Sequence, residues 1–126
     1  MLHPSPQTQA QQDDALVTKA LMRAAHRLDL SNKVISRIIG VSEASVSRMK
    51  DGRYLLPEGS KAFELSLLLI RLFRSLDALT GGDDRVSSTW MKAKNTLLQA
   101  TPVERIQTVT GLSEVIGYVD ARRAVI

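Results

Sequence analysis

Apolar residues recur every three to four positions along most of this sequence, which is the spacing of amphipathic helices. The pattern starts after Asp13 and Asp14, two acids that suit the positive end of a helix dipole and so predict a helix N-terminus there. The apolar positions of this first helix are Leu16, Ala20, Met22, Ala24 and Leu28. Residues 1–12 hold two prolines, four glutamines and few side chains that could pack, so we expect a disordered tail.

Two short helices follow, and serine and glycine residues mark their ends. Ser31 is a good N-cap for the first of them, and Gly40 should end it, because glycine tolerates the left-handed conformation found just past a helix. Ser42 can cap the next helix, which should end near Asp51 and Gly52. The two helices are therefore joined by a tight turn.

The rest of the chain is also predicted to be helical. Residues 60–79 place apolar side chains almost all round a helix, so this segment should be the spine of the fold or a subunit interface. Residues 81–84 are typical of a turn or linker, and residues 101–104 have the capping-box pattern that starts a short helix. Gly111 is expected to separate that helix from a last helix of about ten residues.

These elements predict an all-α protein, since no strand-like alternation extends beyond a few residues. At 126 residues the chain suits one compact domain or two small ones that share a core. We expect one unit over residues 13–80, which carries the paired short helices and the long core or dimerisation helix. A small helical unit should follow over residues 87–126.

The most informative stretch is residues 35–52, Ile-Ser-Arg-Ile-Ile-Gly-Val-Ser-Glu-Ala-Ser-Val-Ser-Arg-Met-Lys-Asp-Gly. Two helices that cross steeply need a small residue at their contact, a glycine at the corner and apolar residues that lock the second helix. The residues that meet these needs are Ser36, Gly40, Val41, Val46 and Met49. The stretch therefore predicts a helix-turn-helix.

The second helix of this motif has a face that could read DNA. With Val46 and Met49 turned inward, the helical period turns the other side chains outward. These are Glu43, Ala44, Ser47, Arg48 and, at the edge, Lys50. Arg48 could bridge O6 and N7 of a guanine, and Glu43 could accept a hydrogen bond from a cytosine amino group.

The spacing resembles the helix-turn-helix of the Xre and phage-repressor family, which has a small residue four before the glycine and a Val-Ser-Arg tripeptide in the recognition helix. Here these are Ser36, Gly40 and residues 46–48. The resemblance implies a phosphate contact for Asn32, at the start of the preceding helix. Candidates for nonspecific phosphate binding are Lys33, Arg37 and Arg53. For these cations a solvated surface is the alternative interpretation.

The C-terminal third is similar to the toxin-binding domain of the Xre, MbcA and ParS antitoxins. The similarity rests on the spacing of Trp90, Asn95, Leu98, Thr101-Pro102, Gly111 and Val115. This family often has a glycine between the Asn and the Thr-Pro, where this chain has Leu98, Gln99 and Ala100.

The resemblance implies an antitoxin of a type II toxin–antitoxin system. Its C-terminal module would block a RES-type toxin, an enzyme that consumes NAD or transfers its ADP-ribose, by covering the entrance of the active site. The resemblance further implies a homodimer that binds double-stranded operator DNA and represses its own operon. Trp90 and Asn95 are then candidate toxin contacts, although a lone tryptophan more often fills a core.

The C-terminal tail is a second candidate for toxin binding. Arg122 and Arg123 lie beside the apolar Val125 and Ile126. Guanidinium groups pair with acids and phosphates in a bidentate manner, so this segment could plug a site built for NAD phosphates. A charged, frayed C-terminus is the alternative.

Composition and charge restrict the other possibilities. The net charge is +4, and residues 13–56 hold eight Lys or Arg against five Asp or Glu, which suits a polyanionic partner. The chain has no cysteine, and its two histidines, His3 and His26, lack the partners of a metal site. No phosphate loop, catalytic carboxylate pair, signal peptide or membrane span is evident. We therefore expect a cytoplasmic protein that is not an enzyme and needs no cofactor or metal.

Two other functions remain open from the sequence. The chain could be a stand-alone dimeric helix-turn-helix repressor, with C-terminal helices that serve only dimerisation. It could also be an adaptor whose helix-turn-helix has lost DNA binding. A dimer that reads two half-sites about one DNA turn apart is typical of the motif.

Overall fold

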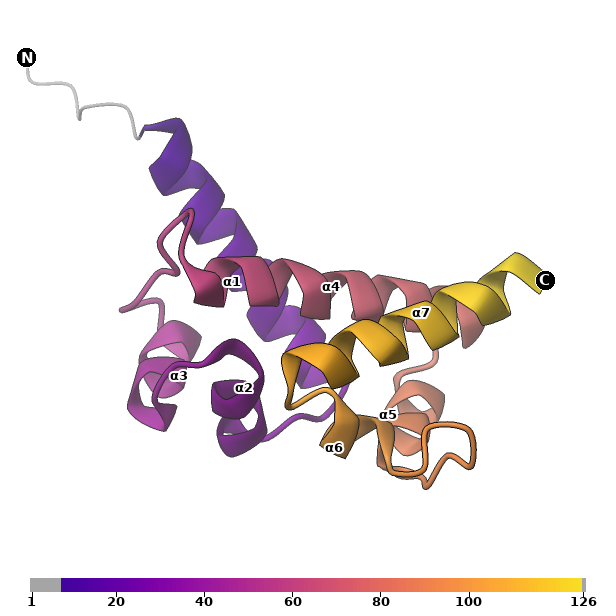
Figure 1. Ribbon diagram of the computed structural model, residues 1–126. Coiled ribbons are helices and arrows are strands. Elements are labelled where there is room, and N and C mark those ends of the chain that lie inside the picture. Colours follow the sequence, from indigo (N-terminus) through magenta and orange to yellow (C-terminus); the bar gives the residue numbers. More distant parts are fainter. Residues whose placement is uncertain (1–7, 126) are drawn as a thin grey trace, which may run out of the picture.

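The computed structural model describes residues 8–125, and all its regular elements in this range are helices (Figure 1). The helices are α1 (Gln9–Arg27), α2 (Asn32–Ile39), α3 (Glu43–Lys50), α4 (Lys61–Leu79), α5 (Asp84–Lys92), α6 (Pro102–Arg105) and α7 (Val109–Val125). This confirms the all-α prediction. α2 and α3 lie on one side of α4, towards its N-terminal end, α5 lies near its C-terminal end, and α6 lies between α5 and the start of α7.

The first helix begins four residues earlier than predicted. The Thr8 hydroxyl accepts a hydrogen bond from the Gln11 amide, and the Gln11 side chain accepts one from the Thr8 amide, so a capping box fixes the start at Gln9. The boundary of a disordered tail at residue 12 was therefore wrong; residues 1–7 lie outside the described residues. Asp13 and Asp14 lie in the second turn instead of at the N-terminus, and Asp14 accepts a hydrogen bond from the Glu58 amide at 2.7 Å.

The caps predicted for α2 and α3 are present. Ser31 accepts a hydrogen bond from the Val34 amide, and Ser42 accepts one from the Ser45 amide. Gly40 ends α2 in the left-handed conformation, with φ of 75°. Local capping therefore sets the turn between the two helices, as the sequence indicated.

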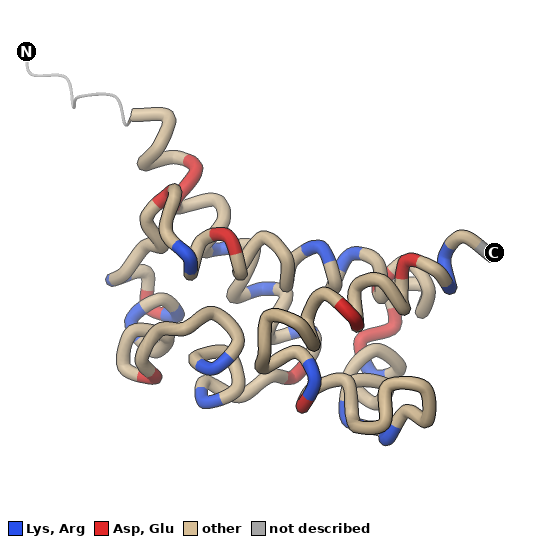
Figure 2. The backbone as a smooth tube through the Cα atoms, viewed as in Figure 1, with Lys and Arg blue, Asp and Glu red and all other residues tan. Residues whose placement is uncertain are grey.

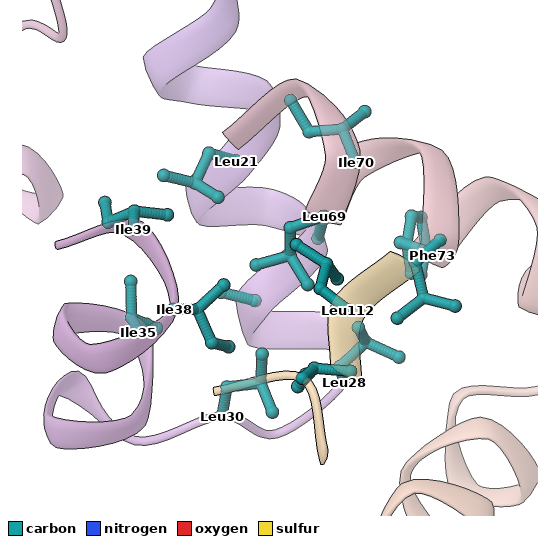
Figure 3. Packing of buried hydrophobic residues seen from close by; sticks show 14 of the residues in the cluster. Leu21, Leu28, Leu30, Ile35, Ile38, Ile39, Leu69, Ile70, Phe73 and Leu112 are labelled. Atoms are coloured by element: carbon teal, nitrogen blue, oxygen red, sulfur yellow. The ribbon is translucent and has the colours of Figure 1, made fainter. Parts of the chain in front are cut away.

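α4 is the spine of the molecule, because it packs against α1 on one side and α7 on the other. Leu69 and Leu72 on α4 are fully buried, as are Leu21 on α1 and Leu112 on α7. Figure 3 shows several of these side chains meeting those of α2 in one cluster. The two predicted units thus share a single hydrophobic core.

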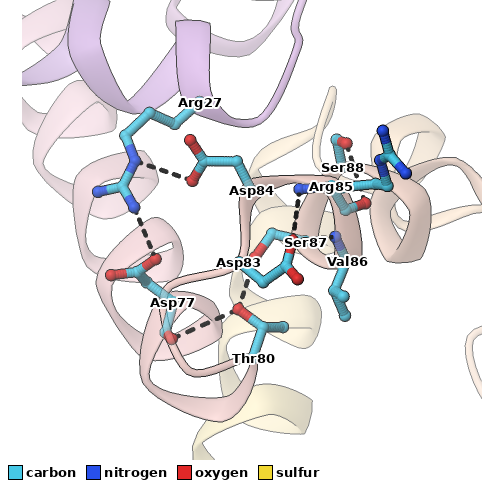
Figure 4. A network of polar contacts seen from close by, with 9 residues as sticks. All are labelled: Arg27, Asp77, Thr80, Asp83, Asp84, Arg85, Val86, Ser87 and Ser88. Carbon is cyan, nitrogen blue, oxygen red and sulfur yellow. Dashed lines mark hydrogen bonds and ion pairs between the residues drawn. The ribbon is translucent and has the colours of Figure 1, made fainter.

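Polar contacts of Arg27 join the C-terminal ends of α1 and α4 to the start of α5 (Figure 4). Its guanidinium group contacts Asp77 at 3.0 Å and Asp84 at 2.9 Å, and it lies 4.7 Å from the centroid of the Phe73 ring. Asp83 caps α5 through hydrogen bonds from the Arg85 and Val86 amides. The segment 81–84 is therefore a structured turn and does not act as a linker.

The last helix is longer than predicted. α7 starts at Val109 and has 17 residues, so Gly111 lies in its first turn and does not separate two elements. A Cβ atom at Gly111 would lie 1.9 Å from the Arg105 carbonyl oxygen. The glycine is needed because the backbone at the end of α6 comes this close.

This close approach predicts opposite effects for two glycines of α7. Gly111→Ala should destabilise the protein by about 3 kcal/mol, because the backbone must move to remove the clash. Gly117→Ala, where an added Cβ meets nothing within 4 Å, should stabilise it by about 0.5 to 1 kcal/mol through helix propensity. Urea denaturation of both variants measures the difference. Equal midpoints would contradict the close packing of α6 on α7.

Candidate functional site

The exposed face of α3 carries the side chains predicted to read DNA. Val46 and Met49 are buried in the core, at 0% and 3% exposure, and fix the rotation of the helix. Glu43, Ala44 and Ser47 are solvent-exposed away from these residues, and Lys50 is exposed at the edge, beside Met49. These four residues share one accessible surface, as the helical period indicated.

Arg48 is the most constrained cation of this surface. Its side chain is half-buried, and its Nη2 donates a hydrogen bond to Ser45 Oγ at 3.1 Å. The Ser45 hydroxyl also lies 3.0 Å from Ser42 Oγ, the N-cap oxygen of α3. A positioned guanidinium group loses less conformational entropy when it pairs with a base edge, which favours direct readout.

The other predicted DNA contacts differ in how free their side chains are. Lys33 is exposed and has no polar partner in the described part of the chain. Arg37 Nη1 lies 3.5 Å from Gln107 Oε1, and Arg53 contacts Asp51 at 2.7 Å. The side-chain oxygen of Asn32 is buried, and no described residue donates a hydrogen bond to it. Among Lys33, Arg37 and Arg53, Lys33 is therefore the residue whose side chain is most available to bind a phosphate group.

In the C-terminal part, Asn95 supports a loop. Its Oδ1 accepts hydrogen bonds from the Leu97 and Leu98 amides at 3.0 and 3.2 Å, and its own amide donates to the Ala100 carbonyl at 3.0 Å. Gln99 in this loop has φ of 58°, a conformation that favours glycine. The loop therefore holds a non-glycine residue, Gln99, in a bend that favours glycine.

An apolar groove lies between the end of α4, α5 and α7. We call it the Trp90 groove; its volume is about 540 Å³. Its lining residues are Leu76, Leu79, Thr80, Val86, Trp90, Tyr118, Val119 and Arg122. Trp90 is half-buried, so it contributes to the core and to the groove wall at once.

Aromatic stacking shapes the groove wall. The Trp90 and Tyr118 rings are stacked, with centroids 6.1 Å apart and planes inclined by 21°. Arg122 lies over the Tyr118 ring, 5.0 Å from its centroid, and donates a hydrogen bond to the Tyr118 hydroxyl at 2.6 Å. The sequence interpretation missed Tyr118 and Val86. The four-residue spacing of Tyr118 and Arg122 on one helix was the available signal for the first of them.

Arg122 and Arg123, which we expected to act as a pair, line different grooves. Arg123 Nη1 donates a hydrogen bond to Ser75 Oγ at 3.2 Å, and its side chain lines a different groove from that of Arg122. Adjacent residues of a helix point about 100° apart, so α7 directs the two guanidinium groups to different surfaces. The side chain of Val125 and all of Ile126 lie outside the described residues.

Two carboxylates tie the C-terminal part to the rest of the fold. The hydrogen bond from Ser75 lowers the pKa of Asp120, and the hydrogen bond from Arg71 at 2.5 Å lowers it further. The hydrogen bond from Lys92 lowers the pKa of Asp29, which lies between α1 and α2. Both carboxylates therefore stay ionised at neutral pH, and their contacts join segments far apart in the sequence.

Residues 8–125 contain no group of three or more His, Asp or Glu that could hold a metal ion. None of the helices in this range is long and apolar enough to cross a membrane.

The fold and these surfaces define a helix-turn-helix protein with an attached helical module. Residues 8–72 match the antitoxin Xre-like helix-turn-helix domain, and residues 75–124 match the antitoxin Xre/MbcA/ParS C-terminal toxin-binding domain. The chain belongs to the Xre/MbcA/ParS-type antitoxins. These families are DNA-binding and toxin-binding regulators of toxin–antitoxin systems, not enzymes. A search of curated proteins found no match.

The different surroundings of Arg48 and Lys33 predict different DNA-binding defects. Arg48→Ala should cost about 1 to 3 kcal/mol of operator affinity and relax discrimination at one base pair, because a base contact is lost. Lys33→Gln should weaken binding to all sequences and reduce the salt slope by about 1. Fluorescence polarisation with operator and scrambled DNA, over a salt series, measures both. If the two variants lose affinity with the same sequence profile, the division of roles is wrong.

Proposed function

We propose that this antitoxin binds and blocks a RES-type, NAD-consuming toxin and, as a homodimer in the cytoplasm, represses its own operon through α3. The observation that carries the proposal is the Trp90 groove. All eight of its lining residues fall within residues 75–124, the segment that matches the toxin-binding domain. An apolar groove in that domain is the surface best suited to a protein partner.

The chemistry of the groove fits an apolar side chain or short segment of the toxin. Val86 of α5 lines the groove and is 49% exposed. Leu76 and Leu79 of α4 add apolar lining. Aromatic anchors in well-packed pockets carry a large part of the energy of protein interfaces. Arg122 at the rim adds a guanidinium group that can pair with a carboxylate of the toxin.

The proposal for DNA rests on the exposed face of α3. Its N-terminal residues Glu43 and Ala44 and the later Ser47, Arg48 and Lys50 share one surface. A two-fold dimer would present two such helices to the half-sites of a palindromic operator.

Val86→Glu should separate toxin binding from folding and from DNA binding. A buried carboxylate in the interface should weaken the complex at least about tenfold, because it would be desolvated without a partner. Co-expression with the product of the neighbouring gene, capture through a tag on the antitoxin and a titration of NAD consumption measure the loss. The matched control is Val109→Glu, since Val109 is also an exposed valine, at 64% against 49% for Val86, and lies outside the groove.

Point variants are preferable to a deletion of residues 87–126. That deletion would uncover the α4 surface against which the fully buried Leu112 and Val115 of α7 pack. Equal loss of toxin binding in both variants, or in neither, would contradict the assignment of the groove. If the unaltered chain forms no complex but binds its upstream DNA, the stand-alone repressor is the correct function.

A further inference from the structure

A second groove lies between α1, α4 and the C-terminal end of α7, and no function described above uses it. Its volume is about 760 Å³. Leu16 and Leu67 line it and are 68% and 45% exposed, which leaves two large aliphatic side chains in contact with solvent. The remaining apolar lining residues are Val17, Ala20, Ile70 and Ala124. We call the part formed by the first and fourth helices the α1–α4 face.

The two helices of this face repeat one charge pattern. Reading along α1, an acid at Asp13 is followed after three residues by Leu16 and after ten by Arg23. Reading along α4, Glu64 is followed after three residues by Leu67 and after ten by Arg74. Positions separated by three, seven and ten residues lie on the same side of a helix.

The charges of both helices are ordered in the same direction across the face. Figure 1 shows that α1 and α4 both begin at the same side of the molecule, and Figure 2 shows acidic positions early in each helix and basic positions farther along. The face therefore has an acidic end, an apolar centre and a basic end. The exceptions on α4 are Lys61 at its start, which contacts Glu64 at 3.4 Å, and Asp77 near its end, which contacts Arg27 at 3.0 Å.

The two arginines at the basic end have no counter-ion in the described part of the chain. Arg23 and Arg74 are both exposed, and neither contacts a carboxylate there. The other cations of this end have partners: Arg71 contacts Asp120, and Arg123 donates a hydrogen bond to Ser75 Oγ. Two guanidinium groups beside an uncovered apolar surface are available to an acidic partner.

We propose that the α1–α4 face is the surface through which two copies of this chain dimerise. A two-fold axis at the centre of the face reverses the direction of α1 and α4 in the second copy. Asp13 then approaches Arg23 of that copy, and Glu64 approaches its Arg74. The leucines meet at the centre, so the pattern is complementary to itself.

The inference rests on the homodimer of the proposed function and names its surface. The face draws mainly on residues of the segment 8–72, which matches the helix-turn-helix domain, whereas the Trp90 groove lies wholly in residues 75–124. Dimerisation and toxin binding therefore use separate surfaces, and the helix-turn-helix part carries its own means of pairing.

Sedimentation velocity of the full-length chain over a range of concentrations tests the apolar centre. Leu67→Glu should raise the dimer dissociation constant at least about tenfold, because each copy would bring a carboxylate to the same desolvated point. Val86→Glu, at nearly the same exposure but in the Trp90 groove, should leave the constant unchanged. Circular dichroism establishes that both variants are folded.

A charge exchange tests the orientation of the two copies. Glu64→Arg and Arg74→Glu should each weaken the dimer, because each places like charges together across the axis. The double variant Glu64→Arg/Arg74→Glu restores opposite charges and should return the dissociation constant to within about threefold of the original. Additive losses in the double variant would overturn the proposed pairing.

Other outcomes separate this inference from the proposed function. A monomeric unaltered chain, or a dimer that Leu67→Glu does not weaken, would overturn the inference and leave toxin binding to be judged by Val86→Glu. A Leu67→Glu variant that stays dimeric but loses the toxin would assign the α1–α4 face to the toxin instead. If Leu67→Glu breaks the dimer and the variant still binds the toxin, the result supports both the dimer surface and the proposed function.

Discussion

The burial of α4 against both α1 and α7 is the constraint on which the rest of the structure depends. This helix has fully buried leucines at Leu69 and Leu72, and even its Ser66 is buried, with the hydroxyl bonded to the Ala62 carbonyl at 2.6 Å. The two family domains meet between residues 72 and 75, inside the helix. Neither domain could bury its apolar surface without α4, so the DNA-binding and toxin-binding parts form one folding unit.

Because both parts share α4, the positions of the three surfaces relative to one another are fixed. The exposed side of α3, the Trp90 groove and the α1–α4 face lie on a frame whose parts are further held by the contacts of Arg27 with Asp77 and Asp84. Those contacts are about 70% shielded at the arginine, which makes them stronger than pairs at an open surface. The relative positions of the three surfaces are therefore set by packing, and not by the length of a linker.

The sequence predicted the features that depend on neighbouring residues and missed those that depend on distant ones. The Ser31 and Ser42 caps and the turn at Gly40 are local, so they could be located without a structure. The start of α1 is an exception: the Thr8–Gln11 capping box that fixes it is local, but the start was assigned to the acids at 13 and 14, and Asp14 in fact bonds to the Glu58 amide. Gly111 was interpreted as a break, although its role is to admit the Arg105 carbonyl. Arg122 and Arg123 were grouped by adjacency, yet they line different grooves.

The arrangement limits how a bound toxin can influence DNA binding. A toxin in the Trp90 groove touches α5 and α7, whose packing on α4 involves close-packed side chains such as Leu76 and Val119. Close-packed interiors resist small deformations, so transmitting a local shift from Trp90 through the core to α3 would cost much free energy. In the proposed dimer, the Trp90 groove and α3 would instead be coupled through the placement of whole molecules. One toxin bound to each copy would add contacts to DNA or obstruct it, because the dimer would fix the position of each toxin relative to the two α3 helices.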